Sequence, residues 1–147
     1  SGLGKRLGGE RCALKGVASA ADAVGALVAG FDTVWVSNHG GRQLESSVAT
    51  IDVLPEIREA VGPNVEVILD GGVRRGIDII KALGLGANSV AIGRAYLYGL
   101  AAGGFDGVDK AIQLIHRDVE LAMGLLGCHT VDELKIKAPQ LIVKRKR

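Results

Sequence analysis

The sequence predicts an α/β protein that is built from parallel βα units. Short runs of β-branched and apolar residues, each suited to one buried strand, alternate with longer segments in which apolar residues recur at helical spacing. This alternation is typical of a parallel sheet that helices cover. A chain of 147 residues is shorter than the roughly 250 residues of a complete barrel of eight such units.

The first elements are expected from residue 13 onward, beginning with a short strand at 13–15. Ser19 followed by Asp22 resembles a capping box and predicts an alanine-rich helix that Gly30 ends. Residues 33–37 (TVWVS) form the next predicted strand, because β-branched and aromatic side chains favour extended backbone.

Thr50 is expected to cap a second helix, which Gly62 and Pro63 end. The remaining predicted elements are strands at 65–69 and 89–92 and helices at 77–85 and 108–126. A faint internal repeat accompanies them: Ala26-Leu27 with Gly30 and Val34 recurs as Ala82-Leu83 with Gly86 and Val90. The predicted strands give four βα units, about half of a barrel.

The composition bounds the rest of the chain. Residues 1–11 are glycine-rich and basic and are expected to form a flexible lead-in, followed by one domain at 12–137 and a basic tail at 138–147. A net charge of +2 and few aromatic residues argue against nucleic acid as a partner. Cys12 and Cys128 lie far apart, so neither a metal site nor a disulfide is expected.

The chain is also expected to be soluble. No apolar run reaches the ~18 residues that a bilayer-spanning helix needs, and the first residues lack the apolar core of a secretory signal. A cytoplasmic location is therefore expected, with the peroxisome as the alternative in a eukaryote.

The strongest candidate for chemistry is SNHGGRQL at residues 37–44, which directly follows a predicted strand. In a parallel barrel the carboxyl ends of the strands form the active face, so His39 and Arg42 are expected to point into a site. An imidazole titrates near neutrality and can take up a proton, while a guanidinium can hold a carboxylate by two parallel hydrogen bonds. A single histidine at a strand end is more often structural than catalytic. The presence of Asn38, Gly40 and Arg42 in the same loop favours a catalytic role for His39.

A second candidate is the loop DGGVRRG at residues 70–76, together with Gly93 and Arg94. Glycine-rich strand ends that lead into helices present backbone N–H groups, and arginine adds a fixed positive fork. Both loops together favour a phosphate site. The alternative is that these glycines only form turns and helix ends.

From about Leu14 to Cys128 the order of these motifs resembles the FMN-dependent α-hydroxy-acid dehydrogenases, which include glycolate oxidase, lactate oxidase and mandelate dehydrogenase. The matching segments are LKG, SNHGGRQL, ATID, DGGVRRG, KALGLGA, GRAYLYGLAAGG and ELAMGLLGC. SNHGGRQL is the most specific of them, whereas DGG and GR recur in other phosphate-binding barrels. The resemblance implies that the chain forms the carboxy-terminal half, strands five to eight, of a TIM (β/α)8 barrel.

The resemblance also implies roles for individual residues. His39 would be the active-site base and contact the substrate, and Arg42 would bind the carboxylate of a small L-2-hydroxy acid. Lys15 would lie near N1 and O2 of the flavin, and Asp70 would additionally orient His39. The residues implied to bind FMN are Lys15, Ser37, Asp70, Gly71, Gly72, Val73, Arg74, Gly93 and Arg94.

Two functions remain open from the sequence. The chain either oxidises a 2-hydroxy acid to the 2-oxo acid as half of a catalytic barrel, or is an inactive fragment or assembly half that at most binds phosphate or FMN. Half a barrel exposes two sheet edges, so we expect a homo-oligomer or pairing with a missing amino-terminal half. Neither the particular acid nor the electron acceptor follows from the residues.

Overall fold

The computed structural model describes residues 11–44 and 46–143. The flexible lead-in predicted at 1–11 and the end of the basic tail at 144–147 therefore lie almost entirely outside the described residues. The chain divides into two compact units. The first comprises Ser1–Gly72 and Gly86–Ala91, and the second comprises Val73–Leu85 and Ile92–Arg147.

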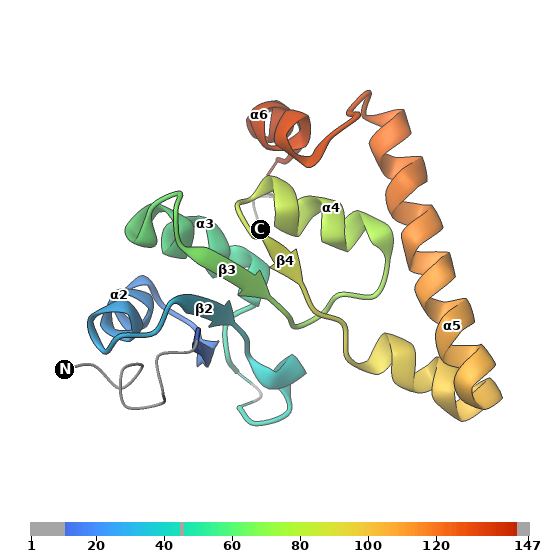
Figure 1. Cartoon of the computed structure of the whole chain (residues 1–147), viewed down its shortest axis with the longest axis horizontal. Helices are drawn as coiled ribbons and strands as arrows, with labels where there is room; N and C mark the ends of the chain where they lie inside the picture. Colours follow the sequence, from blue (N-terminus) through green and yellow to red (C-terminus); the bar gives the residue numbers. More distant parts are fainter. Residues whose placement is uncertain (1–10, 45, 144–147) are drawn as a thin grey trace. The chain divides into compact units, whose positions relative to one another are not determined.

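The first unit contains a parallel sheet of four strands in the order β1-β2-β3-β4, which is also their order along the chain (Figure 1). Its elements are β1 (Ala13–Val17), α2 (Ala20–Val28), β2 (Thr33–Val36), η1 (His39–Gly41), α3 (Thr50–Val61), β3 (Glu66–Leu69) and β4 (Ser89–Val90). Parallel strands that alternate with helices confirm the predicted α/β fold class. β4 is shorter than the strand predicted at 89–92, and η1 is a short 3-10 turn where a loop was expected.

Strand periodicity explains the core of this unit. Val34 and Val36 on β2 and Val67 and Leu69 on β3 are fully or almost fully buried, whereas Trp35 between the two valines is half-buried. α2 packs against α3, and both contribute buried side chains, namely Ala23, Ala26, Leu54 and Ile57. Each large apolar side chain buried in this way stabilises the unit by about 1.5 to 3 kcal/mol.

The two predicted helix caps have different outcomes. Ser19 caps α2 as predicted, since its side chain accepts a hydrogen bond from the backbone N of Asp22. The prediction that Thr50 caps α3 is wrong, because the N-cap is Ala49 and Thr50 is the first helical residue. The Thr50 hydroxyl donates instead to the carbonyl oxygen of Asp70 at 2.7 Å, which ties α3 to the end of β3.

Arg58 on α3 fastens the amino-terminal side of the last two strands. Its guanidinium donates to the carbonyl oxygens of Gly62, Val65 and Gly86 at 2.7 to 2.8 Å and to Asn88 Oδ1 at 2.5 Å. Asn88 Oδ1 also accepts from the backbone N of Val67 in β3. Burial lowers the pKa of Arg58, and the nearby carboxylate of Glu66 opposes that shift.

The second unit consists of α4 (Gly76–Gly84), α5 (Arg94–Leu125) and α6 (Val131–Leu141). Ile80, Cys128 and Leu134 form its buried cluster. α6 was not predicted, and it extends past residue 138, where the sequence placed the start of the basic tail. Among the residues that the structure describes, no helix has both the length and the apolar character that crossing a bilayer requires.

α5 is longer than the helix predicted at 108–126, and it is bent. Its backbone leaves the helical region at Gly103 and Gly104. A Cβ on Gly99 would overlap the carbonyl oxygen of Gly107, so the segments on either side of the bend touch through their backbones. Only glycine permits this approach, which explains why glycine occupies positions 99 and 107 although it has a low helix propensity.

Candidate functional site

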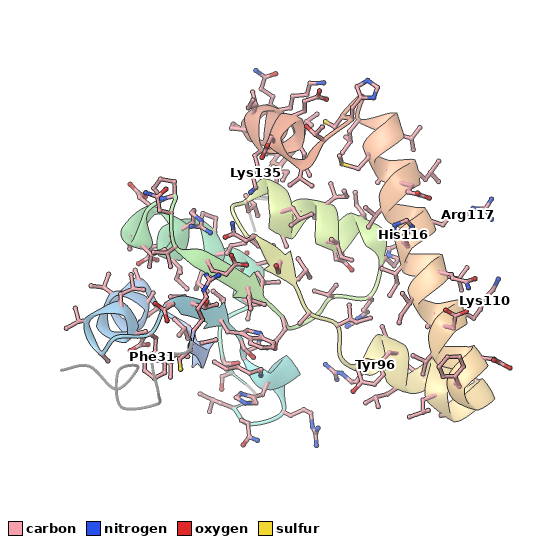
Figure 2. The ribbon with its side chains drawn as sticks, viewed as in Figure 1. Phe31, Tyr96, Lys110, His116, Arg117 and Lys135 are labelled. Atoms are coloured by element: carbon pink, nitrogen blue, oxygen red, sulfur yellow. The ribbon has the colours of Figure 1, made fainter. Side chains whose placement is uncertain are left out.

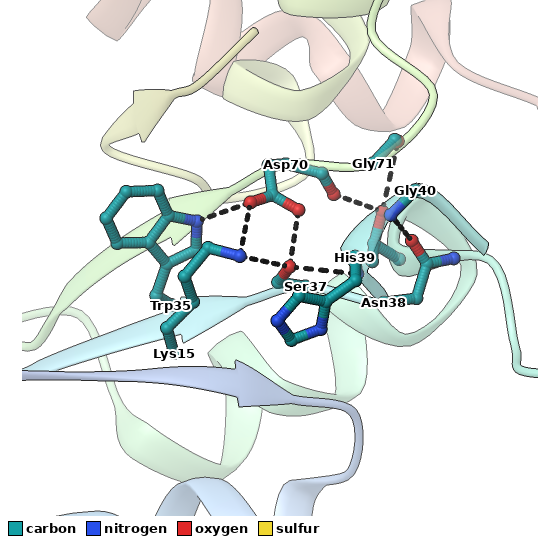
Figure 3. A network of polar contacts seen from close by, with 9 residues as sticks. Lys15, Trp35, Ser37, Asn38, His39, Gly40, Asp70 and Gly71 are labelled. Atoms are coloured by element: carbon teal, nitrogen blue, oxygen red, sulfur yellow. Dashed lines mark hydrogen bonds and ion pairs between the residues drawn. The ribbon is translucent and has the colours of Figure 1, made fainter. Parts of the chain in front are cut away.

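Polar residues from three neighbouring strands meet at the carboxyl edge of the sheet in the first unit (Figure 3). Lys15 lies on β1, Ser37 directly follows β2, and Asp70 directly follows β3. Parallel strands end at the same edge of a sheet, so these residues come together although they are distant in sequence.

A closed network of hydrogen bonds links these side chains. Asp70 Oδ1 accepts from Ser37 Oγ at 2.6 Å, and Asp70 Oδ2 lies 3.2 Å from Lys15 Nζ. Lys15 Nζ in turn donates to Ser37 Oγ at 3.0 Å. Trp35 completes the network, because its Nε1 donates to Asp70 Oδ2 at 3.0 Å. The carboxylate and the ammonium are therefore paired with each other and held by neutral donors and acceptors.

The network continues into the loop that carries His39. Ser37 is only 2 % exposed, and its Oγ also accepts from the backbone N of His39 at 3.2 Å. Asn38 braces the same turn, since its Oδ1 accepts from the backbone N of Gly40 and its Nδ2 donates to the carbonyl oxygen of Val48. The backbone around His39 is thus held by hydrogen bonds that the side chains of Ser37 and Asn38 accept.

His39 has an unusual backbone conformation. Its φ is 54°, and it is the only non-glycine residue with a positive φ in the described part of the chain. Residues in this region of φ/ψ space cost free energy and persist where the surroundings hold them, often at functional sites. The imidazole lies near Gly16 of β1, since a Cβ built on Gly16 would be 3.8 Å from His39 Cε1.

Gly71 fits tightly beneath this loop. Its φ is 95°, and a Cβ at this position would lie 2.7 Å from Asn38 Oδ1 and 3.1 Å from Thr50 Oγ1. Gly72 also has a positive φ of 82°, but a Cβ there would meet no atom within 4 Å. Gly71 is therefore required by both its conformation and its contacts, and Gly72 by its conformation alone.

The structure brings together Lys15, Ser37, His39, Asp70 and Gly71 among the residues that the sequence singled out. The hydrogen bonds and ion pair of the Asp70 carboxylate, within the described residues, go to Trp35, Ser37 and Lys15. Asp70 reaches His39 only through Ser37 and only at the backbone N, so the structure does not show the expected orientation of the imidazole by Asp70. Arg42 is exposed and forms the end of η1, where its backbone N donates to the carbonyl oxygen of His39.

Gly72 is exposed and also lies in the first unit, whereas the remaining predicted cofactor residues belong to the second unit. Val73 is buried, whereas Arg74, Gly93 and Arg94 are exposed. The expectation of available backbone N–H groups at the start of α4 is wrong for residues 74–76, because the chain's own carboxylates accept from them. The backbone N atoms of Arg74 and Arg75 both donate to Asp78 Oδ2 at 3.1 Å. The backbone N of Gly76 donates to Asp118 Oδ2 at 2.7 Å.

Trp35 and Thr50 belong to the site, yet the sequence interpretation treated them only as a strand residue and a helix cap. A signal for Trp35 was present, because residues two apart on a strand share a face and Trp35 precedes Ser37 by two positions. The contact of Thr50 with the end of β3 has no local signal in the sequence.

The donors at the carboxyl edge of the sheet in the first unit suit an anionic ligand. Lys15 Nζ uses two of its three N–H donors for Ser37 and Asp70, which leaves one for a ligand. The backbone at Gly72 borders open space, as does that at Gly93 in the second unit. Within the second unit, considered by itself, Arg74 has an exposed guanidinium that suits a phosphate.

Charged and polar residues beside glycine-rich strand ends, all at the carboxyl edge of a parallel βα sheet, are typical of the active face of α/β barrel enzymes. Comparison with known proteins makes the assignment specific. The chain belongs to the FMN-dependent dehydrogenase family, whose model matches residues 5–141.

Named relatives agree with this family. The chain is 50% identical over 131 residues to an L-lactate oxidase of Lactobacillus jensenii, covering 89% of the chain and 32% of the relative. It is 52% identical over 121 residues to a peroxisomal (S)-2-hydroxyacid oxidase of Arabidopsis thaliana, covering 82% of the chain and 33% of the relative. The chain thus spans about a third of the length of these relatives.

Solved structures resemble the chain closely. A lactate oxidase of Pediococcus acidilactici matches with a TM-score of 0.84 at 43% identity, covering 87% of the chain and 36% of that protein. A mandelate oxidase with an FMN adduct matches with a TM-score of 0.81 at 45% identity, covering 85% and 40%. The family and its cofactor, FMN, are those that the sequence motifs predicted.

Proposed function

We propose that the chain contributes to the FMN-dependent oxidation of a small L-2-hydroxy acid to the 2-oxo acid, as strands five to eight of a catalytic (β/α)8 barrel. The observation that carries the proposal is the convergence of Lys15, Ser37 and His39 at the carboxyl edge of the sheet, with His39 held at positive φ. The names of the relatives, which are oxidases of lactate and other 2-hydroxy acids, support the substrate class.

The reaction removes two electrons and two protons from the C–H and O–H bonds of the carbinol group, and FMN, when bound, would be the acceptor of the two electrons. His39 takes up one proton at a ring nitrogen, which suits a histidine at an accessible strand end. Arg42 binds the substrate carboxylate, because its planar guanidinium matches two carboxylate oxygens and its side chain is exposed.

The residues of this chain would hold FMN through two kinds of group. In the first unit, the Lys15 ammonium favours negative charge on the reduced flavin, while Ser37, Asp70 and the backbone of Gly71 and Gly72 line the same edge. In the second unit, the guanidinium groups of Arg74 and Arg94 would bind the phosphate, together with their chain neighbours Val73 and Gly93. Charged side chains would bind the phosphate more than backbone N–H groups do, because carboxylates of the chain already accept from the backbone N atoms of residues 74–76.

The proposed enzyme needs further strands. β1 and β4 are the outer strands of the sheet, and each pairs with only one neighbour among the described residues. Since the chain spans about a third of its relatives, we propose that amino-terminal βα units of the same family complete the barrel at these edges. Self-association of the chain is the competing way to cover them.

Anaerobic flavin reduction tests the proposed function. The chain is mixed with FMN and with a segment carrying the amino-terminal βα units of the Lactobacillus relative, and the visible flavin spectrum is recorded after addition of L-lactate, glycolate or mandelate. Loss of the oxidised flavin band with at least one acid is expected. D-lactate serves as the matched control and should leave the band unchanged.

Two other results would decide against the proposal. If FMN binds but stays oxidised with every acid, the alternative function is favoured, in which the chain is an assembly half that only binds the cofactor. If the assembly binds FMN no more tightly than riboflavin, the proposed phosphate site is excluded as well, because the two ligands differ only in the phosphate group.

A further inference from the structure

Trp35 contacts both partners of the ion pair at the carboxyl edge of the sheet. Its Nε1 donates to Asp70 Oδ2 at 3.0 Å, and Lys15 Nζ lies 5.5 Å from the centroid of its ring (Figure 3). The first distance fits a hydrogen bond to the anion, and the second fits a cation–π contact with the cation. One side chain therefore holds Asp70 and Lys15 at the same time.

Strand register explains why this arrangement forms. Lys15 and Trp35 are register partners in the parallel pair of β1 and β2, and neighbouring strands lie about 4.8 Å apart. Ser37 shares a face with Trp35, because it follows two residues later. Asp70 comes directly after Leu69, the register partner of Val36. The three strands thus place the four polar side chains of the network at the same level of the sheet.

The ion pair alone would hold the ammonium weakly. The side chain of Lys15 is 39% exposed and that of Asp70 is 17% exposed, and solvent-exposed ion pairs typically contribute only about 0 to 1 kcal/mol. Lysine also has a long and flexible stem. The contacts with Trp35 and Ser37 restrict the rotamers of Lys15 to those that satisfy all three neighbours.

We propose that Trp35 is a positioning residue, which fixes the Lys15 ammonium where the proposed flavin needs it. The indole N–H keeps the Asp70 carboxylate directed at Lys15, and the indole ring covers one side of the ammonium. Trp35 acts through these two residues and is not itself catalytic. The inference rests on the proposed function only in assigning the held ammonium to the flavin.

Acylation of lysine side chains, mapped by mass spectrometry on the whole chain, tests this positioning without any measurement of activity. The reactivity of Lys15 is expressed as a ratio to that of Lys110, an exposed lysine that projects from α5 (Figure 2). An amine held by a hydrogen bond and an ion pair is a poorer nucleophile, so Trp35→Phe, which keeps a ring but loses the N–H donor, should raise the ratio. The rise expected from one such contact is about two- to ten-fold.

Ile68→Val is the matched control. Ile68 is the register partner of Trp35 on β3, and its side chain takes no part in the polar network. This substitution changes packing on the same face and should leave the ratio at the parent value. An unchanged ratio for Trp35→Phe, with the fold verified by circular dichroism, would overturn the proposal.

A second measurement applies if Trp35→Phe does not fold. Trp35 is the single tryptophan of the chain, so its indole N–H gives one resonance in a proton–nitrogen correlation spectrum. Asp70→Asn and Lys15→Met should each move that resonance. A resonance that neither substitution moves would show that the indole does not hold the pair.

Repeating the acylation with FMN separates this proposal from the proposed function. Bound FMN should protect Lys15 in the parent chain and leave Lys110 unprotected. If FMN gives no protection but Trp35→Phe still raises the ratio, Lys15 does not meet the flavin, while its positioning by Trp35 stands. If FMN protects Lys15 but the ratio is unchanged in Trp35→Phe, Lys15 meets the flavin and Trp35 does not position it.

Discussion

The two glycines after β3 provide a matched pair of substitutions whose effects should differ. Gly71 and Gly72 both have positive φ, so alanine at either position costs about 1 to 2 kcal/mol of backbone strain. At Gly72 the new Cβ meets no atom within 4 Å, and strain is the whole effect. At Gly71 the new Cβ would lie 2.7 Å from Asn38 Oδ1 and 3.1 Å from Thr50 Oγ1.

The overlap at Gly71 has a further cost. Asn38 must move, which weakens the hydrogen bond from the backbone N of Gly40 to Asn38 Oδ1, or Thr50 must move, which weakens its bond to the carbonyl oxygen of Asp70. Each such bond contributes about 0.5 to 1.5 kcal/mol net. Gly71→Ala should therefore lower the free energy of unfolding by about 1.5 to 3.5 kcal/mol, and Gly72→Ala by about 1 to 2 kcal/mol.

Urea unfolding of the whole chain, followed by circular dichroism, measures both values. The variants differ by the weakened bond, about 0.5 to 1.5 kcal/mol, so at a slope of about 1 to 3 kcal/mol per molar urea the two midpoints should separate by roughly 0.2 to 1.5 M. Equal midpoints for the two variants would refute the reasoning, because the overlap with Asn38 and Thr50 would then cost nothing.

Three further predictions concern single contacts. Arg42→Lys should weaken both substrate binding and the rate of flavin reduction in the reconstituted assembly, because an ammonium cannot make the planar bidentate contact; equal kinetics would exclude that contact. Arg58→Ala should lower the free energy of unfolding by about 2 to 4 kcal/mol, measured by urea unfolding, because it leaves carbonyl acceptors before β3 and β4 without their donor. Asp118→Ala should speed hydrogen exchange at the backbone N of Gly76, whereas Asp118→Asn, which keeps an acceptor, should do so less; identical exchange in both would contradict the hydrogen bond.

Local patterns were sufficient to predict the strands and much of the site. β2 carries β-branched residues around Trp35, and its alternation and the glycine-rich loops that follow each strand are visible without any tertiary information. The same patterns place His39 and Asp70 at strand ends. Because parallel strands end at one edge, the sequence then predicts that these residues lie near each other.

Other features depend on contacts that no local pattern reveals. Thr50 has the residue type of a helix cap, but the carbonyl oxygen of Asp70 at the end of β3 satisfies its hydroxyl instead. The first part of α5 is rich in glycine and lacks helix propensity, and it is the backbone contact between Gly99 and Gly107 that accounts for those glycines. The hydrogen bond between Trp35 and Asp70 joins residues from different strands.

α6 is a different case, because its signal was present in the sequence. Thr130 accepts a hydrogen bond from the backbone N of Glu133, and Glu133 Oε2 accepts from the backbone N of His129. The T-x-x-E pattern that produces this cap marks a helix start. This pattern predicts a helix at the point where the boundary between domain and tail was expected.

The rate of flavin reduction in His39 variants tests the central claim most directly. In the reconstituted assembly with FMN and a 2-hydroxy acid, His39→Asn removes the base but retains a residue type that tolerates positive φ, so the loop should keep its conformation. The account predicts that FMN binds with unchanged affinity and that its reduction slows by about 10² to 10⁴. Reduction at the parent rate would show that His39 is a structural histidine and would contradict the proposed chemistry.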